Sequence, residues 1–470
     1  MSPSAPDEEI LRDREAVEAR LEQAQLLCDV SIEGASLEGM NLSDTVIRDV
    51  RFTEVALGGV DLRGTVLHGV EFDRCDLTGA NLSEAILSDC FFGPGTRLSG
   101  AVCVGLTGDS LDLSLCGLGE LDLRAATLTD AVLADASLDG SLFEAADLTG
   151  ADLSGASLNK AKMMSATLEQ ADLRGASLAG VDLSGAHLSG AQLAGTNLRR
   201  VRLGQADLRG LDLTELAAAP RSLRRARLDS ADLSGLDLSR ANLEDAVLEG
   251  AKLLGTTLSR GSLVNARAKG ASFVGAKLNG ARLDRADLRG ADFSSADLRG
   301  ASLEGADLTD VTLESANLEG ARIAGAVLTG VDLSAGGFTL EGLAGTCFAG
   351  CALRGVSFEA ADLAGADFTG ADLRDADFTD ADLTGADLSD VNATGASFVR
   401  ARMRDVTAAG ADLSGADLTG AVLGRAKLKA VKLEGACLRG AQLLIASLDG
   451  CDLRGVDLVG ANLDHCTMKG

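Results

Sequence analysis

Large aromatic residues are almost missing from this chain of 470 residues, which contains no Trp, no Tyr and only 13 Phe. Pro is also rare, with 4 residues, whereas Gly reaches 57. So few bulky side chains do not fit a conventional globular core of this size. The information must therefore lie in the order of the residues, and an internal repeat is the first feature to expect.

Long apolar runs and an excess of basic residues are missing as well. No run of about 18 apolar residues occurs, and the N-terminus MSPSAPDEEI has no basic segment followed by an apolar one, so neither a membrane span nor a secretion signal is predicted. Lys and Arg number 43 against 70 Asp and Glu, giving a formal net charge of -27. This charge disfavours direct binding to nucleic acid. We expect a cytoplasmic protein with no membrane partner.

Motifs for catalysis or for cofactor binding are not found. The ten Cys include no CxxC pair and no metal-ligand spacing, and no Gly-rich phosphate-binding sequence is present. His68, His187 and His465 lie far apart, and none is expected beside a nucleophile. The sequence therefore predicts that the protein is not an enzyme and has no cofactor or metal site.

What the chain does contain is a five-residue repeat of a small, a polar, a large apolar and a polar residue, often ending in Gly, as in ADLTGADLSG at 146–155. The large residue, called the repeat centre below, recurs from Ile32 to Phe92 and from Leu98 to Met468, in roughly 88 repeats. Successive centres would lie about 140° apart around a helix, so no apolar stripe forms. In extended backbone, however, the centre and the residue two before it face the same side.

Phe residues at intervals of 20 indicate the size of one coil, because unusually large side chains should stack on their own kind in adjacent coils. These series are Phe52, Phe72 and Phe92; Phe273 and Phe293; Phe338, Phe358, Phe378 and Phe398; and Phe348 and Phe368. Four five-residue sides therefore close each coil. At about 4.8 Å per coil, roughly 22 coils would make a square-sided parallel solenoid about 105 Å long.

The repeats ADLSG at 151–155, ADLRG at 171–175 and ADLTG at 381–385 resemble the A-[D/N]-L-x-x motif of the pentapeptide-repeat proteins. The resemblance extends over residues 32 to 468, and its specificity comes from the number of in-phase copies. It implies an all-β fold, a right-handed quadrilateral parallel β-helix.

Residues 1–30 are expected to form a short N-terminal capping helix, and residues 31–470 to form the β-helix as one continuous domain. Ser4 to Glu9 have N-cap character, with acids in the first turn. The apolar stripe of this helix would consist of Ile10, Val17, Leu21, Ala24 and Cys28. Such a helix either covers the open end of the solenoid or binds a partner.

Three irregular places interrupt the repeats. A one-residue register break lies at 93–97, in the Pro-Gly turn between the centres Phe92 and Leu98. Faults of a similar kind occur at 216–220 and at 336–342, where Glu341 falls at an inward position. Bends or protruding loops are expected there.

Acidic residues are unevenly distributed. We define the acidic band as Glu359, Asp362, Asp367, Asp372, Asp375, Asp377, Asp380, Asp382, Asp387 and Asp390. Within the band the only basic residue is Arg374, whereas residues 199–289 are relatively basic. The band is a candidate partner-binding surface. The alternative is structural, because Asp before a repeat centre can bond its own backbone near the turn.

The C-terminal repeats continue in register to Met468, which leaves the centres of the last coil uncovered. We define the end cluster as Leu458, Leu463 and Met468. An open solenoid end is a template for another chain, so the end cluster is predicted to be a self-association surface that forms an end-to-end C-terminal homodimer.

Two functions follow from these features. The first is a non-catalytic protein–protein interaction scaffold or spacer, built as an acidic rod. The alternative, implied by the resemblance, is a DNA mimic that binds a type II topoisomerase (gyrase) and protects it from inhibitors. A charge of -27 over about 105 Å is one per about 4 Å, against about 1.7 Å in DNA. Only the acidic band reaches the density of DNA.

Overall fold

The computed structural model describes residues 9–24, 26–323, 325–329, 331 and 343–469. They belong to two compact units, Met1–Asp232 and Leu233–Gly470. The boundary between the units falls inside the region that the sequence assigns to a single repeat domain. No helix among the described residues is long and apolar enough to cross a membrane.

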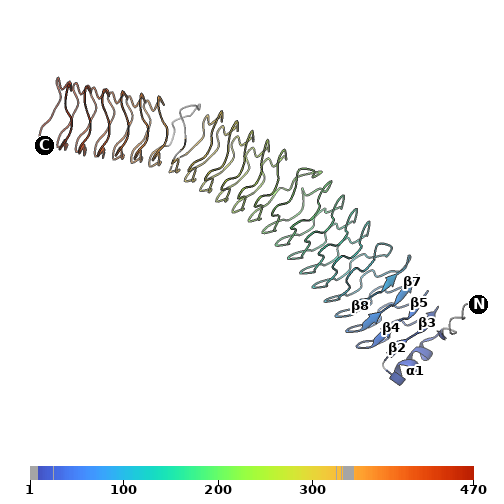
Figure 1. Ribbon diagram of the computed structural model, residues 1–470. Coiled ribbons are helices and arrows are strands. Elements are labelled where there is room, and N and C mark those ends of the chain that lie inside the picture. Colours follow the sequence, from blue (N-terminus) through green and yellow to red (C-terminus); the bar gives the residue numbers. More distant parts are fainter. Residues whose placement is uncertain (1–8, 25, 324, 330, 332–342, 470) are drawn as a thin grey trace, which may run out of the picture. The chain divides into compact units, whose positions relative to one another are not determined.

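Unit 1 begins with two small parallel sheets and one helix (Figure 1). One sheet has the order β1-β3-β5-β7-β9 and the other the order β2-β4-β6-β8. The elements are β1 (Glu9–Leu11), α1 (Arg14–Ala24), β2 (Leu26–Cys28), β3 (Val30–Glu33), β4 (Val46–Arg48), β5 (Arg51–Thr53), β6 (Val66–His68), β7 (Glu71–Asp73), β8 (Ile86–Ser88) and β9 (Phe91–Phe92). Ile32 pairs with Phe52 and Phe52 with Phe72. Each coil is therefore 20 residues long.

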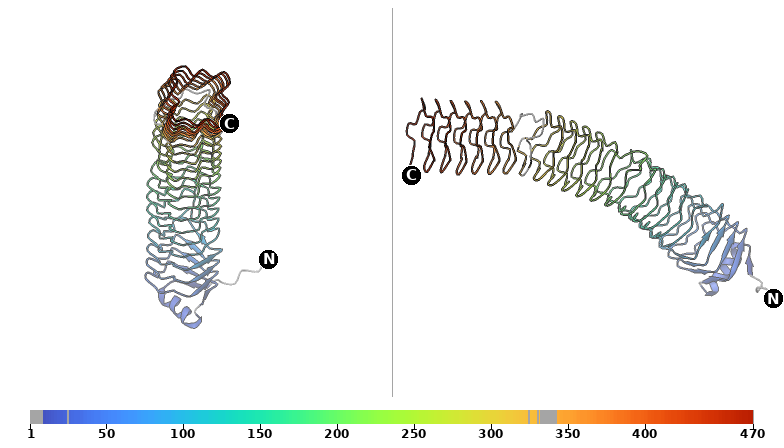
Figure 2. Two further views of the ribbon diagram at one scale, coloured as in Figure 1. Left: turned by 90° about the vertical axis from the view of Figure 1, so that its left-hand side faces the viewer. Right: turned by 45° about the horizontal axis from the view of Figure 1, so that its top comes forward.

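Beyond β9 the same parallel pairing continues as isolated bridges, because a turn follows every repeat. Asp147 is bridged to Thr167, and Asp367 to Asp387, again 20 residues apart. The amide of Leu148 donates to the carbonyl of Thr167 at 2.8 Å, which joins two neighbouring coils. Figure 2 shows these successive coils within each unit. Both units are therefore stretches of a β-helix solenoid.

The core of each unit is a column of stacked large side chains flanked by small ones. The rings of Phe52 and Phe72 stack at 5.0 Å, and those of Phe273 and Phe293 at 4.6 Å. Most of the Ala residues two positions before a centre are buried as well. The interval of 20 between Phe residues is therefore the interval between stacked rings. Phe338 lies outside the described residues.

The register changes by one residue at 93–97. Asp76 is bridged to Arg97, 21 residues further on, whereas Arg97 is bridged to Gly117 at the usual 20. A second change of this kind pairs Asn197 with Ala218. Each extra residue is taken up in a turn, so coil stacking resumes afterwards. The fault expected at 336–342 lies outside the described residues.

The predicted helical segment 1–30 is too long. Helix α1 covers only Arg14–Ala24, and its N-cap is Asp13, whose Oδ1 accepts a hydrogen bond from the amide of Ala16 at 2.8 Å. Ser4 to Glu8 lie outside the described residues. Of the predicted stripe, Val17 is buried in the helix.

Two members of that stripe belong to strands. Ile10 lies in β1, paired with Ser31, and Cys28 lies in β2, paired with Arg48. The reason is that strand pairing with the next coil satisfies a whole row of backbone groups, which an isolated helical turn at these positions cannot do. As a consequence β1, and not the helix, forms the edge of its sheet.

Candidate interaction surfaces

The Asp residue before a repeat centre closes the turn that follows. Oδ1 of Asp377 accepts hydrogen bonds from the amide of Thr379 at 3.0 Å and from its hydroxyl at 2.6 Å. Asp382 makes the same two bonds with Thr384, at 3.0 and 2.5 Å. This is the local backbone bond that the structural alternative predicts. These carboxylates therefore hold the coil together, whatever else they do.

Where the repeat reads Asp-Leu-Arg, the carboxylate also binds the arginine two residues later. In Asp372 and Arg374 the Nε and Nη2 atoms donate to the two carboxylate oxygens at 2.8 and 2.6 Å. These charge-assisted bonds hold the pKa of the Asp372 carboxyl below its ordinary value. The same pair occurs at Asp61 and Arg63, Asp122 and Arg124, Asp172 and Arg174, Asp207 and Arg209, Asp287 and Arg289, Asp297 and Arg299, and Asp452 and Arg454.

The ten carboxylates of the acidic band do not gather on one face. Two pairs share a column, meaning equivalent positions of successive coils: Asp362 is bridged to Asp382, and Asp367 to Asp387. Asp372 and Asp377 belong to the other two columns, since they are bridged to Asn392 and Ser397. Three more, Asp375, Asp380 and Asp390, occupy turns with φ of 57–58° and are exposed, as are Glu359 and Asp362.

Arginines from neighbouring coils neutralise part of the band. Arg354 lies 3.1 Å from Asp375, Arg400 lies 2.5 Å from Asp380, and Arg402 lies 3.2 Å from Asp382. The charge count along the sequence missed these three partners, because they lie outside residues 359–390. The coil length of 20 was the signal that identifies them, since two of the three spacings equal it.

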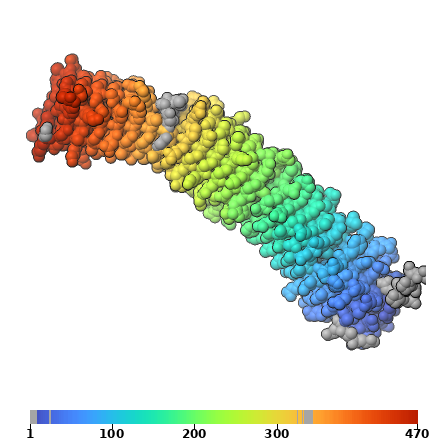
Figure 3. Space-filling model, in the orientation of Figure 1, coloured from blue at the N-terminus to red at the C-terminus, as the bar shows by residue number. Residues whose placement is uncertain are grey.

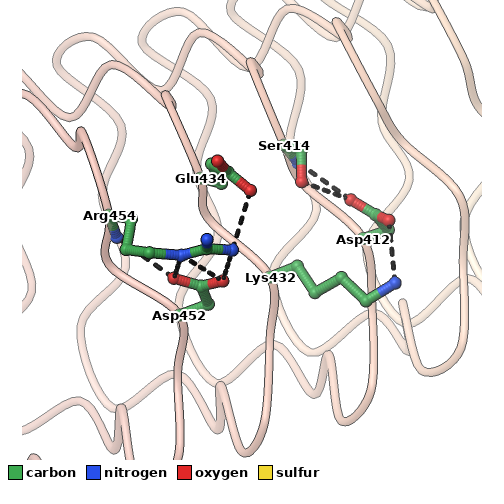
Figure 4. A network of polar contacts seen from close by, with 6 residues as sticks. All are labelled: Asp412, Ser414, Lys432, Glu434, Asp452 and Arg454. Carbon is green, nitrogen blue, oxygen red and sulfur yellow. Dashed lines mark hydrogen bonds and ion pairs between the residues drawn. The ribbon is translucent and has the colours of Figure 1, made fainter.

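Such pairing between coils also occurs outside the band. Figure 4 shows Lys432 with Nζ 3.1 Å from Asp412 Oδ2, while the Ser414 hydroxyl donates to the other oxygen at 2.6 Å. One coil further on, Arg454 contacts both Asp452 and Glu434. Partial burial opposes ionisation of Asp412, but the bonds from Ser414 and Lys432 prevail and lower its pKa. The negative surface is thus divided into locally compensated patches.

Cys residues at the small inward position behave as core residues. Burial raises the pKa of the Cys75 and Cys90 thiols to about 11 and that of Cys351 to about 12. Cys103, a repeat centre, is also buried, and its pKa is raised to about 12. Among the described residues no group of three or more potential ligands could hold a metal ion.

One expectation about histidine is wrong. His68 does lie beside a hydroxyl nucleophile, because Ser88 is exactly one coil further on, with Oγ 2.9 Å from His68 Nδ1. Asp89 Oδ2 lies 3.5 Å from the same nitrogen. In a catalytic triad the acid and the nucleophile contact opposite ring nitrogens. This surface cluster therefore has the residue types of a triad without its geometry.

At the C-terminal coil the repeat centres lose their cover. Leu448 is 2% exposed, but Leu458 and Leu463 are only half-buried and Met468 is 46% exposed. Val459, next to this cluster, is 68% exposed. The end cluster therefore presents an apolar surface on the last described coil.

Shallow hollows mark the sides of both units. On the face visible in Figure 3, the side chains of neighbouring coils of each unit touch, and no deep cleft opens. In unit 1, hollows of about 310 Å³ and 340 Å³ lie beside Gly204 and beside Arg199. In unit 2, a hollow of about 440 Å³ lies beside Gly424, Leu444 and Ile445.

A family model described as pentapeptide repeats matches most of the chain. The matched residues are 27–64, 57–93, 126–164, 141–180, 176–214, 222–260, 269–305, 306–335, 343–380, 371–407, 409–443 and 446–470. The chain belongs to the pentapeptide-repeat family. The first match includes Leu27, one repeat before the predicted start at Ile32, in agreement with the pairing of Leu27 and Ile47.

Solved pentapeptide-repeat structures are similar only at a distance. Trypsin-treated QnrB1, a plasmid-mediated fluoroquinolone resistance protein, is 21% identical, with 43% of this chain and 90% of that chain covered and a TM-score of 0.30. Rfr23 from the cyanobacterium Cyanothece 51142 is 25% identical, with coverages of 24% and 84% and a TM-score of 0.20. HetL from Nostoc, involved in heterocyst differentiation regulation, is 24% identical, with coverages of 67% and 90% and a TM-score of 0.14. A search of curated proteins finds no match.

Proposed function

We propose that this pentapeptide-repeat protein is a non-catalytic scaffold or spacer for protein–protein interaction in the cytoplasm, built as a right-handed quadrilateral β-helix. The observation that carries the proposal is the division of each repeat into a buried half and a displayed half. Ala361 and Leu363 are buried while Asp362 faces solvent, and this alternation recurs in coil after coil. Such a fold offers long columns of side chains at fixed spacing, which suits the recognition of a partner along one face.

A corner scan tests the scaffold function. Asp375, Asp380, Asp390 and Asp405 are exposed turn residues, one for each corner of the coil. Each is changed to Arg, which the turn tolerates because Arg400 and Arg425 adopt the same backbone conformation. We expect the reversal at one corner to weaken capture of a native partner by about tenfold or more, measured by cross-linking mass spectrometry of full-length bait.

The other three corner variants are the matched controls and should retain the partner. Equal loss from all four variants, or no specific partner for the wild type, would contradict a scaffold that binds through one face. Thermal melting of each bait excludes unfolding as the cause.

The acidic band favours a second candidate, a DNA mimic that binds a type II topoisomerase (gyrase) and protects it from inhibitors. Five of its carboxylates are exposed, and its charge density exceeds that of the rest of the chain. The distribution over four columns and the arginines of neighbouring coils reduce the resemblance to a DNA backbone, so this function stands second.

Asn substitution separates the two roles of the band. Changing Asp372, Asp377, Asp382 and Asp387 to Asn removes charge but keeps a side-chain oxygen for the amide two residues later. If the band mimics DNA, the Asn variant should lose gyrase protection in a supercoiling assay with a fluoroquinolone and still melt like the wild type. The corresponding Ala variant also loses stability, by about 0.5–1.5 kcal/mol for each lost bond.

The matched control changes Asp147 and Asp152 to Asn, which hold the same repeat position outside the band. This control should protect gyrase as well as the wild type does. Wild-type protein that neither inhibits nor protects gyrase at micromolar concentration would eliminate the DNA mimic.

A further inference from the structure

One column of unit 2 brings an apolar ridge and a hollow together. Arg404, Gly424, Leu444 and Asp464 follow one another on consecutive coils, because the amides of Asp405, Arg425 and Ile445 donate to the carbonyls of Gly424, Leu444 and Asp464 at 3.0, 2.9 and 3.0 Å. Leu444 and Ile445 are 45% and 55% exposed. They border the hollow of about 440 Å³.

The ridge is held in an unfavourable backbone conformation. Ile445 has φ of 63°, in the left-handed region, and among the described residues it is the only β-branched residue with positive φ. The branched side chain makes this conformation costly. Because its side chain is exposed, burial within its own chain does not compensate. Strain at an exposed apolar residue is typical of a binding surface.

The hollow exists because Gly424 has no side chain at a position where the neighbouring coils carry Arg404 and Leu444. A Cβ at Gly424 would meet only Leu444 O at 3.8 Å and Arg404 Cγ at 3.9 Å, and no positive φ restricts this residue. Neither backbone conformation nor local packing therefore requires Gly here. The missing side chain instead leaves room for an apolar group from outside.

The charges along this column are complementary in reverse order. Arg425 forms an ion pair with Asp405 at 3.0 Å. Within the described part of the chain, neither the Arg404 guanidinium nor the Asp464 carboxylate has an ion-pair partner. They flank the ridge and the hollow at equal distances, one coil before Gly424 and one coil after Leu444.

From this arrangement we propose that unit 2 binds a second copy of this chain side by side and antiparallel. The two-fold axis lies in the interface and crosses the column midway between the coils of Gly424 and Leu444. It places Leu444 of each copy over Gly424 of the other, and Arg404 opposite the partner's Asp464. Contacts of this kind are isologous, as a two-fold dimer requires.

The alternative parallel arrangement fails on the same residues. It would set Arg404 against Arg404 and Leu444 against Leu444, and the two hollows would remain empty. The antiparallel contact is small, so the dimer is expected to depend on concentration. This inference is independent of the proposed scaffold function and of gyrase.

Sedimentation velocity of the full chain across a dilution series tests the ridge and the hollow. The wild type should shift from monomer to dimer as the concentration rises to high micromolar. Ile445→Asn removes the ridge and introduces a residue that tolerates the left-handed conformation, so this variant should lose the dimer yet melt at or above the wild-type temperature. Gly424→Leu fills the hollow and should also be monomeric.

A charge exchange tests the orientation. Arg404→Asp and Asp464→Arg should each be monomeric, because each places like charges opposite one another in both halves of the interface. An equimolar mixture of the two variants should restore a dimer, since a heterodimer of these chains has opposite charges at both places. Recovery in the mixture cannot arise from misfolding of either variant.

Three outcomes would overturn the proposal. The first is wild-type protein that is monomeric at every concentration. The second is a dimer that persists in both Ile445→Asn and Gly424→Leu, and the third is a mixture of the charge variants that stays monomeric. Leu463→Asp in the end cluster is the control for an end-to-end dimer: it should leave the side-by-side dimer intact, and loss of the dimer in this variant alone would assign the contact to the end cluster.

Discussion

Replacing Phe378 by Ala is expected to lower the free energy of unfolding of unit 2 by about 3–5 kcal/mol. The ring is fully buried, stacks on Phe358 and Phe398 at 4.9 and 5.0 Å, and meets the edge of Phe368 at 5.7 Å. Its loss leaves a cavity between coils that cannot collapse, because the backbone bonds between coils fix their spacing. This substitution should be among the most damaging single changes in the chain.

The damage should remain local, since each coil contacts only its neighbours. Hydrogen exchange should therefore accelerate in the coils of residues 358–398 and much less in unit 1. Phe91→Ala is the control: Phe91 is 49% exposed, and its loss should cost about 0.5 kcal/mol or less. Unchanged melting and unchanged local protection in Phe378→Ala would show that the Phe stack does not stabilise the solenoid.

Acid is expected to destabilise both units. The Asp residues of the eight Asp-Leu-Arg pairs all have pKa values held below their ordinary value, mainly by hydrogen bonds from their arginines. In the unfolded chain Asp titrates near about 3.9. The unfolded state therefore takes up more protons as the pH falls. The stabilisation is fully present above about pH 4 and is lost as the pH falls through the folded-state values.

Each pair contributes little by itself because its arginine is about half exposed, but eight pairs act in the same direction. Urea unfolding from neutral pH to about pH 2 measures the effect. Asp207→Asn should reduce the slope most among single variants of unit 1, because its side chain is only 8% exposed and lies near both Arg209 and Arg227. Stability that rises continuously towards pH 2 would contradict this account.

The sequence was sufficient for the repeat length, the length of the coil and the division into buried and exposed positions. A motif such as ADLTG at 146–150 fixes the same local conformation each time, and the interval between Phe52 and Phe72 counts the residues in one coil. Because every coil has almost the same neighbours, a local rule predicts the architecture of each unit. The structural role of Asp before a centre followed for the same reason.

The tertiary structure decided what depends on individual side chains in adjacent coils. A spacing of 20 places Arg400 near Asp380, but the pairing itself also depends on rotamers and on competing partners. Near the N-terminus, pairing with the next coil overrode the helical pattern and placed Ile10 and Cys28 in strands. The sequence by itself determined the address of each residue in the solenoid; which of those residues neutralise one another, and which, like Ile445, remain exposed under strain, was decided by packing between coils.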